Sequence, residues 1–157
     1  LDLGCGNGWM SKKLLKVFVS INYLGVDGAE NMIKKAKLTY PNQNYLCVDI
    51  NNWLPSNLFD LVISMEVLYY LKDPSKFLKD FYRVGVSQDG LVVIGIDHYK
   101  ENTASLNWPD ALDVHMQTFT INEWVDIFWK AGFSDISYEQ FNRRDDWAGT
   151  LIIKAIK

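Results

Sequence analysis

Three glycines separated by single residues stand near the start of the chain, in the stretch LDLGCGNG at residues 1–8. Gly4, Gly6 and Gly8 would let the backbone turn tightly from a strand into a helix, and would let a ligand approach without interference from Cβ atoms. Taken alone, such a loop can also be a plain strand-to-helix turn. Its spacing is G-x-G-x-G, which departs from the G-x-G-x-x-G fingerprint of dinucleotide-binding proteins.

Carboxylates stand next to the glycine loop and at the carboxyl ends of the next two predicted strands. These ends should lie at one edge of the sheet, the expected ligand edge. Asp2 directly precedes the loop, and Asp27 and Asp49 end the second and third predicted strands. Asp27 follows Gly4 by 23 residues, close to the roughly 20-residue offset at which an acid binds ribose hydroxyls. A pyrophosphate would prefer fewer carboxylates, whereas Asp2 suits an ammonium group. The pattern therefore favours an amino-acid nucleoside sulfonium as ligand.

The elements that must position these residues alternate between strand-like and helix-like patterns. Apolar residues at helical spacing predict helices over 10–18, 29–36, 74–82 and 121–131, and apolar runs predict strands over 22–26, 45–48, 59–64, 91–96, 136–141 and 150–156. Asp73 and Pro74 are typical of an N-cap followed by proline at the first helical position. The segment Thr120–Glu123 is a capping box, and Gly132 stands where a C-cap glycine belongs.

This alternation predicts an α/β fold with a Rossmann-like, doubly wound sheet, mostly parallel with an antiparallel last strand. The last two strands have no helix between them, so they should pair antiparallel. Residues 1–157 are expected to form one domain that begins inside its first strand and lacks an N-terminal segment. Residues 98–119 are expected to be an irregular insert that covers a substrate site as a lid.

Composition restricts the classes of partner. The net charge of −3 gives no electrostatic footprint for nucleic acid, and no apolar run approaches the length that spans a membrane. Two cysteines, Cys5 and Cys47, cannot make a disulfide framework, which favours a cytoplasmic location. Cys47 is expected to be buried. His98 and His115 stand without other ligands at metal-binding spacing, so no metal site is expected.

With these residues in view, the chain resembles the class I S-adenosylmethionine-dependent methyltransferases of the group called methyltransferase type 11. The resemblance rests on the glycine motif and on the stretches VDGAENM at 26–32, CVDI at 47–50 and FDLVISMEVL at 59–68, and it extends over nearly the whole chain. It implies the class I methyltransferase fold, S-adenosylmethionine as cofactor with S-adenosylhomocysteine as product, and a small-molecule methyl acceptor.

The resemblance also implies roles for the residues at the expected ligand edge. Asp2 and the backbone of Gly4–Gly8 would hold the methionine part of the cofactor, Asp27 the two ribose hydroxyls, and Asp49 the adenine amino group. The residues expected to bind the cofactor are Asp2, Gly4, Cys5, Gly6, Asn7, Gly8, Asp27, Gly28, Met32, Asp49, Ile50, Ser64 and Met65.

Four of these residues are apolar or small side chains beside the cofactor. Met32 would pack near the adenine and Ile50 against its ring, with simple core packing as the alternative for both. Ser64 and Met65, after the fourth strand, would line the methionine side.

Methyl transfer is an in-line displacement that demands alignment and exclusion of water, and it needs a base only if the acceptor must lose a proton. His98 is the candidate general base, with a loop histidine that only hydrogen-bonds substrate or backbone as the alternative. The candidates for substrate contact follow the fifth predicted strand: Asp97, His98, Tyr99, Trp108 and His115.

Other functions stay open at this point. An RNA or protein methyltransferase and a non-catalytic cofactor-binding module are the main alternatives, while the glycine spacing disfavours an NAD-dependent oxidoreductase. The stretch SMEV at 64–67 stands where methyltransferases of exocyclic base amines carry an Asn/Asp-Pro-Pro-aromatic segment, which argues against that activity. The sequence does not indicate the acceptor atom or the oligomeric state.

Overall fold

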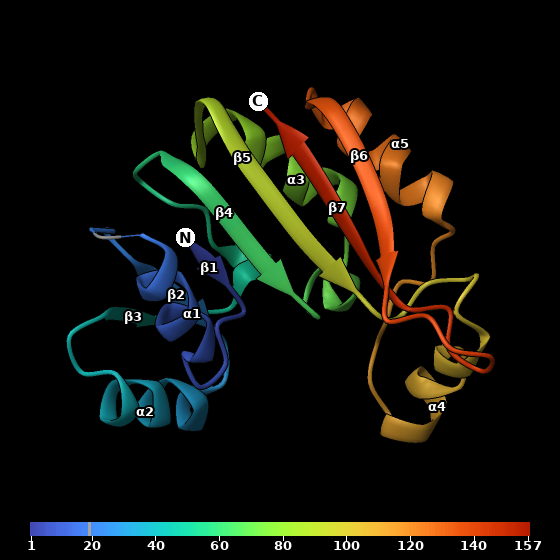
Figure 1. The fold of residues 1–157 in the computed structure, drawn as a ribbon, viewed down its shortest axis with the longest axis horizontal. Coiled ribbons are helices and arrows are strands. Elements are labelled where there is room, and N and C mark those ends of the chain that lie inside the picture. Colours follow the sequence, from blue (N-terminus) through green and yellow to red (C-terminus); the bar gives the residue numbers. More distant parts are fainter. Residues whose placement is uncertain (19) are drawn as a thin grey trace. The chain divides into compact units, whose positions relative to one another are not determined.

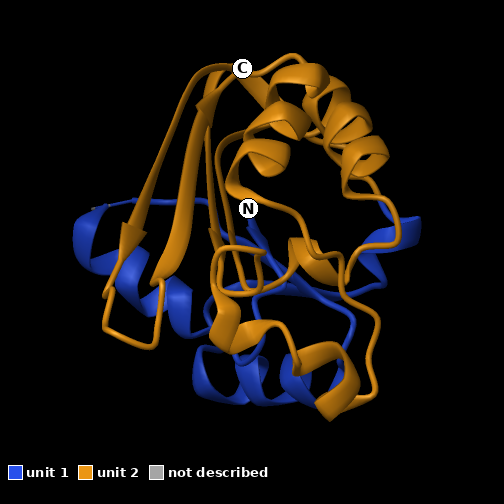
Figure 2. Cartoon of the chain, turned by 90° about the vertical axis from the view of Figure 1, so that its right-hand side faces the viewer, with its two compact units in different colours: residues 1–53 blue, residues 54–157 orange. Residues whose placement is uncertain are grey.

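A computed structural model describes residues 1–18 and 20–157 of the chain (Figure 1). The chain divides into two compact units, Leu1–Trp53 and Leu54–Lys157, which are coloured separately in Figure 2. The expectation of one domain over residues 1–157 stays a prediction.

The first unit alternates strands and helices from its first residues. Its elements are β1 (Asp2–Leu3), α1 (Trp9–Val17), β2 (Leu24–Asp27), α2 (Glu30–Thr39), β3 (Asn44–Cys47) and the short 3-10 helix η1 (Ile50–Asn52). The three strands are parallel, in the order β3-β2-β1. Asp2 lies opposite Gly25, and Asp27 lies opposite Cys47. Because parallel strands end at the same edge, the loop after β1 and the carboxylate that ends β2 become neighbours.

The core of the first unit includes a residue of the glycine loop. Cys5, Tyr23, Ile33, Ala36 and Tyr45 form one buried cluster. The alternation of helix and strand predicted for this region is confirmed, with element bounds that shift by one to three residues.

One sequence expectation about this unit is wrong, since Cys47 is exposed. It ends β3, the outer strand of the three, where one side of the strand has no neighbouring strand within the unit.

The second unit contains a four-stranded sheet and the remaining helices. Its elements are β4 (Phe59–Met65), η2 (Leu68–Tyr70), α3 (Pro74–Val84), β5 (Val86–Ile96), η3 (Thr103–Ser105), α4 (Trp108–Leu112), α5 (Ile121–Ala131), β6 (Ser134–Phe141) and β7 (Thr150–Ile156). The strands lie in the order β4-β5-β7-β6. β4 and β5 are parallel, and β7 runs antiparallel to both β5 and β6. The predicted α/β class with an antiparallel last strand is confirmed.

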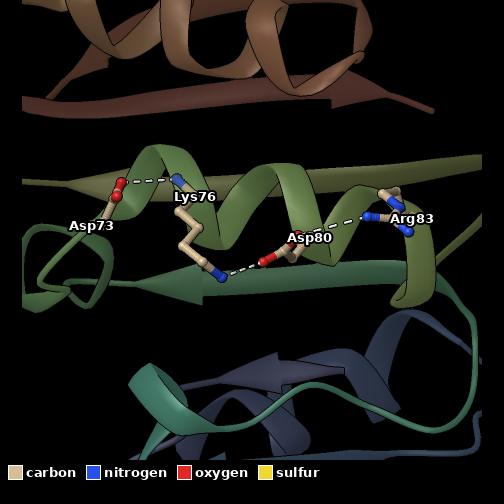
Figure 3. A network of polar contacts seen from close by, with 4 residues as sticks. All are labelled: Asp73, Lys76, Asp80 and Arg83. Atoms are coloured by element: carbon tan, nitrogen blue, oxygen red, sulfur yellow. Dashed lines mark hydrogen bonds and ion pairs between the residues drawn. The ribbon is translucent and has the colours of Figure 1, made fainter.

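Helix α3 begins as the sequence predicts. The Asp73 carboxylate accepts a hydrogen bond from the backbone N–H of Lys76, and Pro74 occupies the first turn. On the exposed side, the Lys76 ammonium lies 2.6 Å from Asp80, and Arg83 lies 3.9 Å from the same carboxylate (Figure 3). Exposed pairs of this kind contribute little to stability, so the buried apolar face of α3 is what fixes the helix in the unit.

Helix α5 also begins and ends at its predicted residues. Thr120 and Glu123 form the reciprocal capping box, and Gly132 ends the helix with a left-handed backbone, φ +110°. α5 contacts α3 as well as β6 and β7, and Figure 2 shows the helices of this unit gathered on one face of its sheet.

Two details of the second unit differ from expectation. β5 begins at Val86 rather than near residue 91, because the segment after α3 already pairs with Phe59 of β4. Residues 98–119, expected to be irregular, contain η3 and the short helix α4, in which Pro109 occupies the first turn. None of the helices in the described ranges has the length and apolarity required to cross a bilayer.

Candidate functional site

The glycine loop adopts the conformation that its glycines were expected to permit. Gly4, Gly6 and Gly8 have φ values of +70°, +53° and +78°, a region that side-chain-bearing residues rarely adopt. A Cβ added at Gly6 would meet no atom within 4 Å, whereas one at Gly8 would lie 2.5 Å from the Tyr45 hydroxyl. Gly8 is thus required by the protein's own packing, and Gly6 borders open space that a ligand can enter.

The backbone of this loop is tied down from within the unit. The N–H groups of Gly4 and Cys5 both donate to the Val26 carbonyl, at 2.8 and 3.0 Å. The N–H of Gly8 donates to the Cys5 carbonyl at 2.9 Å. The N–H groups of Gly4, Cys5 and Gly8 already have acceptors within the unit. The open space beside Gly6 is therefore the main feature of the loop that a ligand can use.

Asp27 joins the end of β2 to the loop. Its two carboxylate oxygens accept hydrogen bonds from the N–H groups of Gly6 and Ala29, each at 2.8 Å. A carboxylate oxygen has lone pairs for a further donor, so the half-buried Asp27 keeps capacity for two hydroxyl groups. The structure thus brings Asp27 and the glycine loop into direct contact.

Asp2 lies deeper, at the start of the same loop, and is only 3% exposed. The Tyr23 hydroxyl donates a hydrogen bond to its Oδ2 at 2.7 Å. Burial raises the pKa of Asp2 to about 6, with the Tyr23 hydrogen bond acting in the opposite direction and Asp27 adding to the rise. Sequence reasoning missed Tyr23, because only the fold brings residues 21 positions apart together.

The remaining predicted residues of the first unit lie after β2 and β3. Asp49 is exposed and accepts hydrogen bonds from Asn51 and Asn52 at 2.9–3.0 Å, which holds the turn η1. Ile50 is half-buried, and Met32 is 46% exposed. The core-packing alternative therefore fails for Met32.

Two further residues of the predicted cofactor set carry less structural information. Gly28 is exposed, and a Cβ there would make only ordinary contacts, at 3.7 Å from the Val48 carbonyl oxygen. Asn7 lies in the loop, where its side-chain oxygen accepts a hydrogen bond from the N–H of Trp9 at 3.3 Å.

In the second unit, Ser64 and Met65 end strand β4 as predicted. Ser64 is fully buried and Met65 is half-buried. The Met65 side chain lies so close to Gly95 of the neighbouring strand β5 that a Cβ at Gly95 would collide with its terminal methyl group. Gly95 is what allows this methionine to lie across β5.

Glu66, the next residue, is a functional candidate that sequence reasoning did not single out. It has a left-handed backbone, φ +61°, at the end of β4. Its Oε2 accepts hydrogen bonds from the Tyr69 hydroxyl at 2.9 Å and from the Asp97 N–H at 3.2 Å. Within the described residues, Glu66 Oε1 and Asp97 Oδ1 are buried and have no hydrogen-bond partner.

The pKa of Glu66 depends on its surroundings. Burial raises the pKa of Glu66 to about 7, and the nearby Asp97 adds to this rise. Such a raised pKa together with an unsatisfied buried oxygen is typical of a functional carboxylate. The sequence had offered Asp97 directly after a predicted strand, and the corresponding signal for Glu66 was its position two residues after the predicted strand 59–64.

His98 is fully buried, and both of its ring nitrogens are engaged. Nδ1 lies 3.0 Å from the Ser105 carbonyl oxygen and Nε2 lies 2.8 Å from the Thr118 hydroxyl. A carbonyl can only accept, so Nδ1 carries the proton and Nε2 of the neutral ring accepts from Thr118. Burial lowers the pKa of His98. This geometry favours the alternative interpretation, in which His98 ties the two ends of the insert together.

The three remaining candidates for substrate contact differ in exposure and in their contacts. Tyr99 is buried, and its hydroxyl donates to the Gly149 carbonyl at 2.8 Å. Trp108 is half-buried and stacks between the rings of His98 and Trp147, with centroid distances of 6.2 and 6.0 Å. His115 is exposed, with Nε2 3.3 Å from the side-chain amide nitrogen of Gln117.

Among the residues that the structure describes, no group of three or more histidine, cysteine or acidic side chains is placed to hold a metal ion.

The fold and the loop together define a class I methyltransferase domain, and comparison with known proteins agrees. The family described as "Methyltransferase domain" matches residues 1–94. The chain belongs to this family, which confirms the predicted class and S-adenosylmethionine as its cofactor.

Curated relatives are similar over parts of their length. The malonyl-[acyl-carrier protein] O-methyltransferase of Paenibacillus sp. (strain JDR-2) is 27% identical over 165 residues, which cover 94% of this chain and 59% of that protein. The trans-aconitate 2-methyltransferase of Azoarcus sp. (strain BH72) is 28% identical over 83 residues, covering 53% and 33%. The chain thus spans between one third and three fifths of the length of these relatives.

A solved structure shows the same fold. It is the complex between the Trm112 methyltransferase activator and the putative methyltransferase of Haloferax volcanii, with a TM-score of 0.85 and 23% identity over 99% of this chain and 79% of that one. This likeness confirms the predicted fold class.

The residues present in the first unit fit S-adenosylmethionine. The open space at Gly6 leaves room for a ligand against the loop, and the buried carboxylate of Asp2 matches the ammonium group of the cofactor. The spare acceptor capacity of Asp27 matches a pair of ribose hydroxyls.

Proposed function

We propose that the chain binds S-adenosylmethionine through residues 1–53 and transfers its methyl group to a small-molecule acceptor. The observation that carries this proposal is the glycine loop hydrogen-bonded to Asp27 through Gly6, with the Asp2 carboxylate buried at the start of the same loop. When bound, the cofactor supplies an electrophilic methyl carbon on a positively charged sulfur, with a neutral thioether as leaving group.

In this proposal each of the three aspartates of the first unit has a separate task. Asp2 holds the cofactor's ammonium group, Asp27 the ribose hydroxyls, and Asp49 the adenine amino group. Met32 and Ile50 pack near the adenine. Their different exposure supports this division, since Asp2 is buried whereas Asp49 and Met32 are open to a ligand.

Gly28 and the backbone of Cys5 and Asn7 complete the contacts in the first unit. For Ser64 and Met65, in the second unit, the role implied by the resemblance stays a prediction. The buried hydroxyl of Ser64 and the half-buried Met65 stand directly before Glu66 at the end of β4.

On the acceptor side, we assign the acceptor contact to Glu66 and Asp97. Glu66 Oε1 and Asp97 Oδ1 lack partners within the described residues, and both atoms can accept a hydrogen bond from an acceptor O–H or N–H. With a pKa of about 7, Glu66 can also take up the proton that such an acceptor loses.

This assignment restricts the class of acceptor. A carboxylate such as trans-aconitate, the substrate named in one relative, is already ionised at neutral pH and needs no base. Two neighbouring carboxylates would also repel an anionic acceptor. An acceptor that donates an O–H or N–H therefore fits Glu66 and Asp97 better than a carboxylate does.

Two measurements test the proposal. In a thermal-shift assay, S-adenosylhomocysteine at 100 times its Kd should stabilise the chain by about 2.7 kcal/mol. NAD should leave the melting temperature unchanged. S-adenosylmethionine with a labelled methyl group should then label alcohols, phenols or amines in a panel that also contains carboxylic acids.

The matched control is Glu66→Gln, which keeps the shape of the side chain but cannot take up a proton. It should retain S-adenosylhomocysteine binding and lose transfer to O–H or N–H acceptors. Transfer restricted to carboxylic acids and unaffected by Glu66→Gln would refute the acceptor assignment. Transfer only to RNA or protein would refute the small-molecule assignment.

A further inference from the structure

Tyr23 stands directly before strand β2 and places its hydroxyl against the buried carboxylate of Asp2. Tyr23 is 4% exposed, and its hydroxyl donates to Asp2 Oδ2 at 2.7 Å. The hydroxyl reaches Asp2 because Gly25, which lies opposite Asp2 in the sheet, has no side chain. A Cβ at Gly25 would lie 2.9 Å from the Tyr23 hydroxyl oxygen and 2.8 Å from Cys5 Sγ.

The ring of Tyr23 is held in place by the core of the first unit. Its edge packs against Tyr45, with ring centroids 5.8 Å apart and planes at 70°. Both rings belong to the buried cluster that contains Cys5 and Ile33. The hydroxyl is therefore fixed in direction before any ligand binds, which is the arrangement that makes a hydrogen bond effective.

Among the described groups around Asp2, Tyr23 is the side chain that favours the ionised carboxylate. Burial and, to a smaller extent, Asp27 disfavour the ionised carboxylate. In the described part of the chain, no lysine or arginine side chain is among the groups that shift the pKa of Asp2, and Tyr23 gives the one side-chain hydrogen bond that favours the charged form. Cys5 and Tyr45, the other titratable neighbours, are themselves held neutral by burial.

We propose that Tyr23 is a positioning residue, which holds Asp2 ionised and oriented for the ammonium group of S-adenosylmethionine. This inference rests on the proposed role of Asp2. Tyr23 touches neither the methyl group nor the acceptor, so its effect should be confined to binding of the amino-acid part of the cofactor.

The test uses Tyr23→Phe, which removes the hydroxyl and keeps the ring in the core. Its matched control is Tyr40→Phe, because Tyr40 packs partly buried against the same cluster. Calorimetry between pH 5 and pH 9 would compare two probes. S-adenosylhomocysteine carries the ammonium group, and 5′-methylthioadenosine is the same nucleoside thioether without the amino-acid part.

In Tyr23→Phe the affinity for S-adenosylhomocysteine should fall roughly tenfold at neutral pH, the lower range for a lost hydrogen bond to a charged group. The affinity for 5′-methylthioadenosine should stay within about twofold, and Tyr40→Phe should match the wild type for both probes. The pH below which S-adenosylhomocysteine binding weakens should also move upward, because the ionised form of Asp2 has lost its donor.

A readout without ligand completes the test. Carbon NMR of the Asp2 carboxyl should show a higher pKa in Tyr23→Phe than in the wild type. An unchanged pKa with unchanged affinity would overturn the inference. An equal loss of affinity for both probes would also overturn it, because it would indicate general damage to the unit.

Asp2→Asn separates this inference from the proposed function. If Asp2→Asn binds S-adenosylhomocysteine like the wild type, the assigned role of Asp2 fails and the role of Tyr23 fails with it. If Asp2→Asn binds weakly while Tyr23→Phe binds like the wild type at every pH, only the role of Tyr23 is refuted.

Discussion

Replacement of Asp2 by asparagine should stabilise the fold while it weakens cofactor binding. Asp2 is 3% exposed, and burial raises its pKa to about 6 from the ordinary 3.8. An aspartate whose pKa is higher in the folded than in the unfolded chain favours folding fully below its unfolded pKa, and this contribution is lost as the pH rises through the folded pKa. The loss should therefore develop between pH 4 and pH 6.

The magnitude follows from the two pKa values. The difference between about 6 and 3.8, at 1.36 kcal/mol for each pH unit, corresponds to about 3 kcal/mol of unfolding free energy. Asparagine stays neutral and can still accept the hydrogen bond from Tyr23, so Asp2→Asn avoids this loss. Its own amide N–H groups also need partners in the buried site, which makes 3 kcal/mol an upper value.

The assay is urea unfolding of wild type and Asp2→Asn at pH values from 4 to 8. The two proteins should be about equally stable at pH 4, and the variant should be more stable by up to about 3 kcal/mol above pH 7, or about 6–12 °C in Tm for a chain of this size. Asp145→Asn, in the exposed turn before β7, is the control and should show no such gain. A constant difference between wild type and Asp2→Asn at every pH would refute the reasoning.

Three further predictions concern the loop and the second unit. Gly6→Val should cost about 1–2 kcal/mol of unfolding free energy, because Gly6 has φ +53°, and should abolish S-adenosylhomocysteine binding in calorimetry; a variant that binds normally would contradict the idea that the open space at Gly6 is the ligand's. For the wild type, kcat/KM with an O–H or N–H acceptor should rise with pH through about 7 as Glu66 ionises, and Glu66→Gln should lower it by about 10²–10⁴ and flatten the profile; a profile unchanged by the substitution would exclude Glu66 as base. His98→Ala should lower the unfolding free energy by roughly 1–3 kcal/mol in urea titrations, because it leaves the partners of both ring nitrogens unpaired. Because burial lowers the pKa of His98, the wild type should lose stability as the pH falls below about 6.5 whereas His98→Ala should lose less; equal pH dependence would show that His98 is not the titrating group.

Elements that depend on local chemistry were predictable from the sequence. The Asp73–Pro74 start of α3, the Thr120–Glu123 capping box and the glycine at the end of α5 lie where the sequence placed them. Each requires only residues within one helical turn, so no knowledge of the remaining fold is needed. The antiparallel end of the sheet was equally predictable, because two strands without a helix between them can return only as neighbours.

The first unit's candidate site was also largely visible in the sequence. The glycine spacing and Asp27 determine a loop that meets the end of the second strand, and the Gly6–Asp27 hydrogen bond has this form. Parallel strands of similar length bring their ends together, so positions one strand apart in the sequence can be placed on the same edge. The exposure of Cys47 was not predictable in this way, because it depends on which strand lies outermost.

Only the tertiary structure decided the chemical state of the polar groups. The hydroxyl that faces Asp2 comes from 21 residues away, and the group that holds His98 Nε2 from 20 residues away. The sequence allowed His98 to be a candidate base because it gave no partner for the ring nitrogens. In the fold, both nitrogens have hydrogen-bond partners. In the sequence, Glu66 was only one residue of the stretch FDLVISMEVL. In the described part of the fold, one of its carboxylate oxygens is buried without a hydrogen-bond partner. The sequence by itself determines which groups reach the ligand edge, whereas burial and long-range hydrogen bonds decide their protonation, because both depend on neighbours that no local pattern specifies.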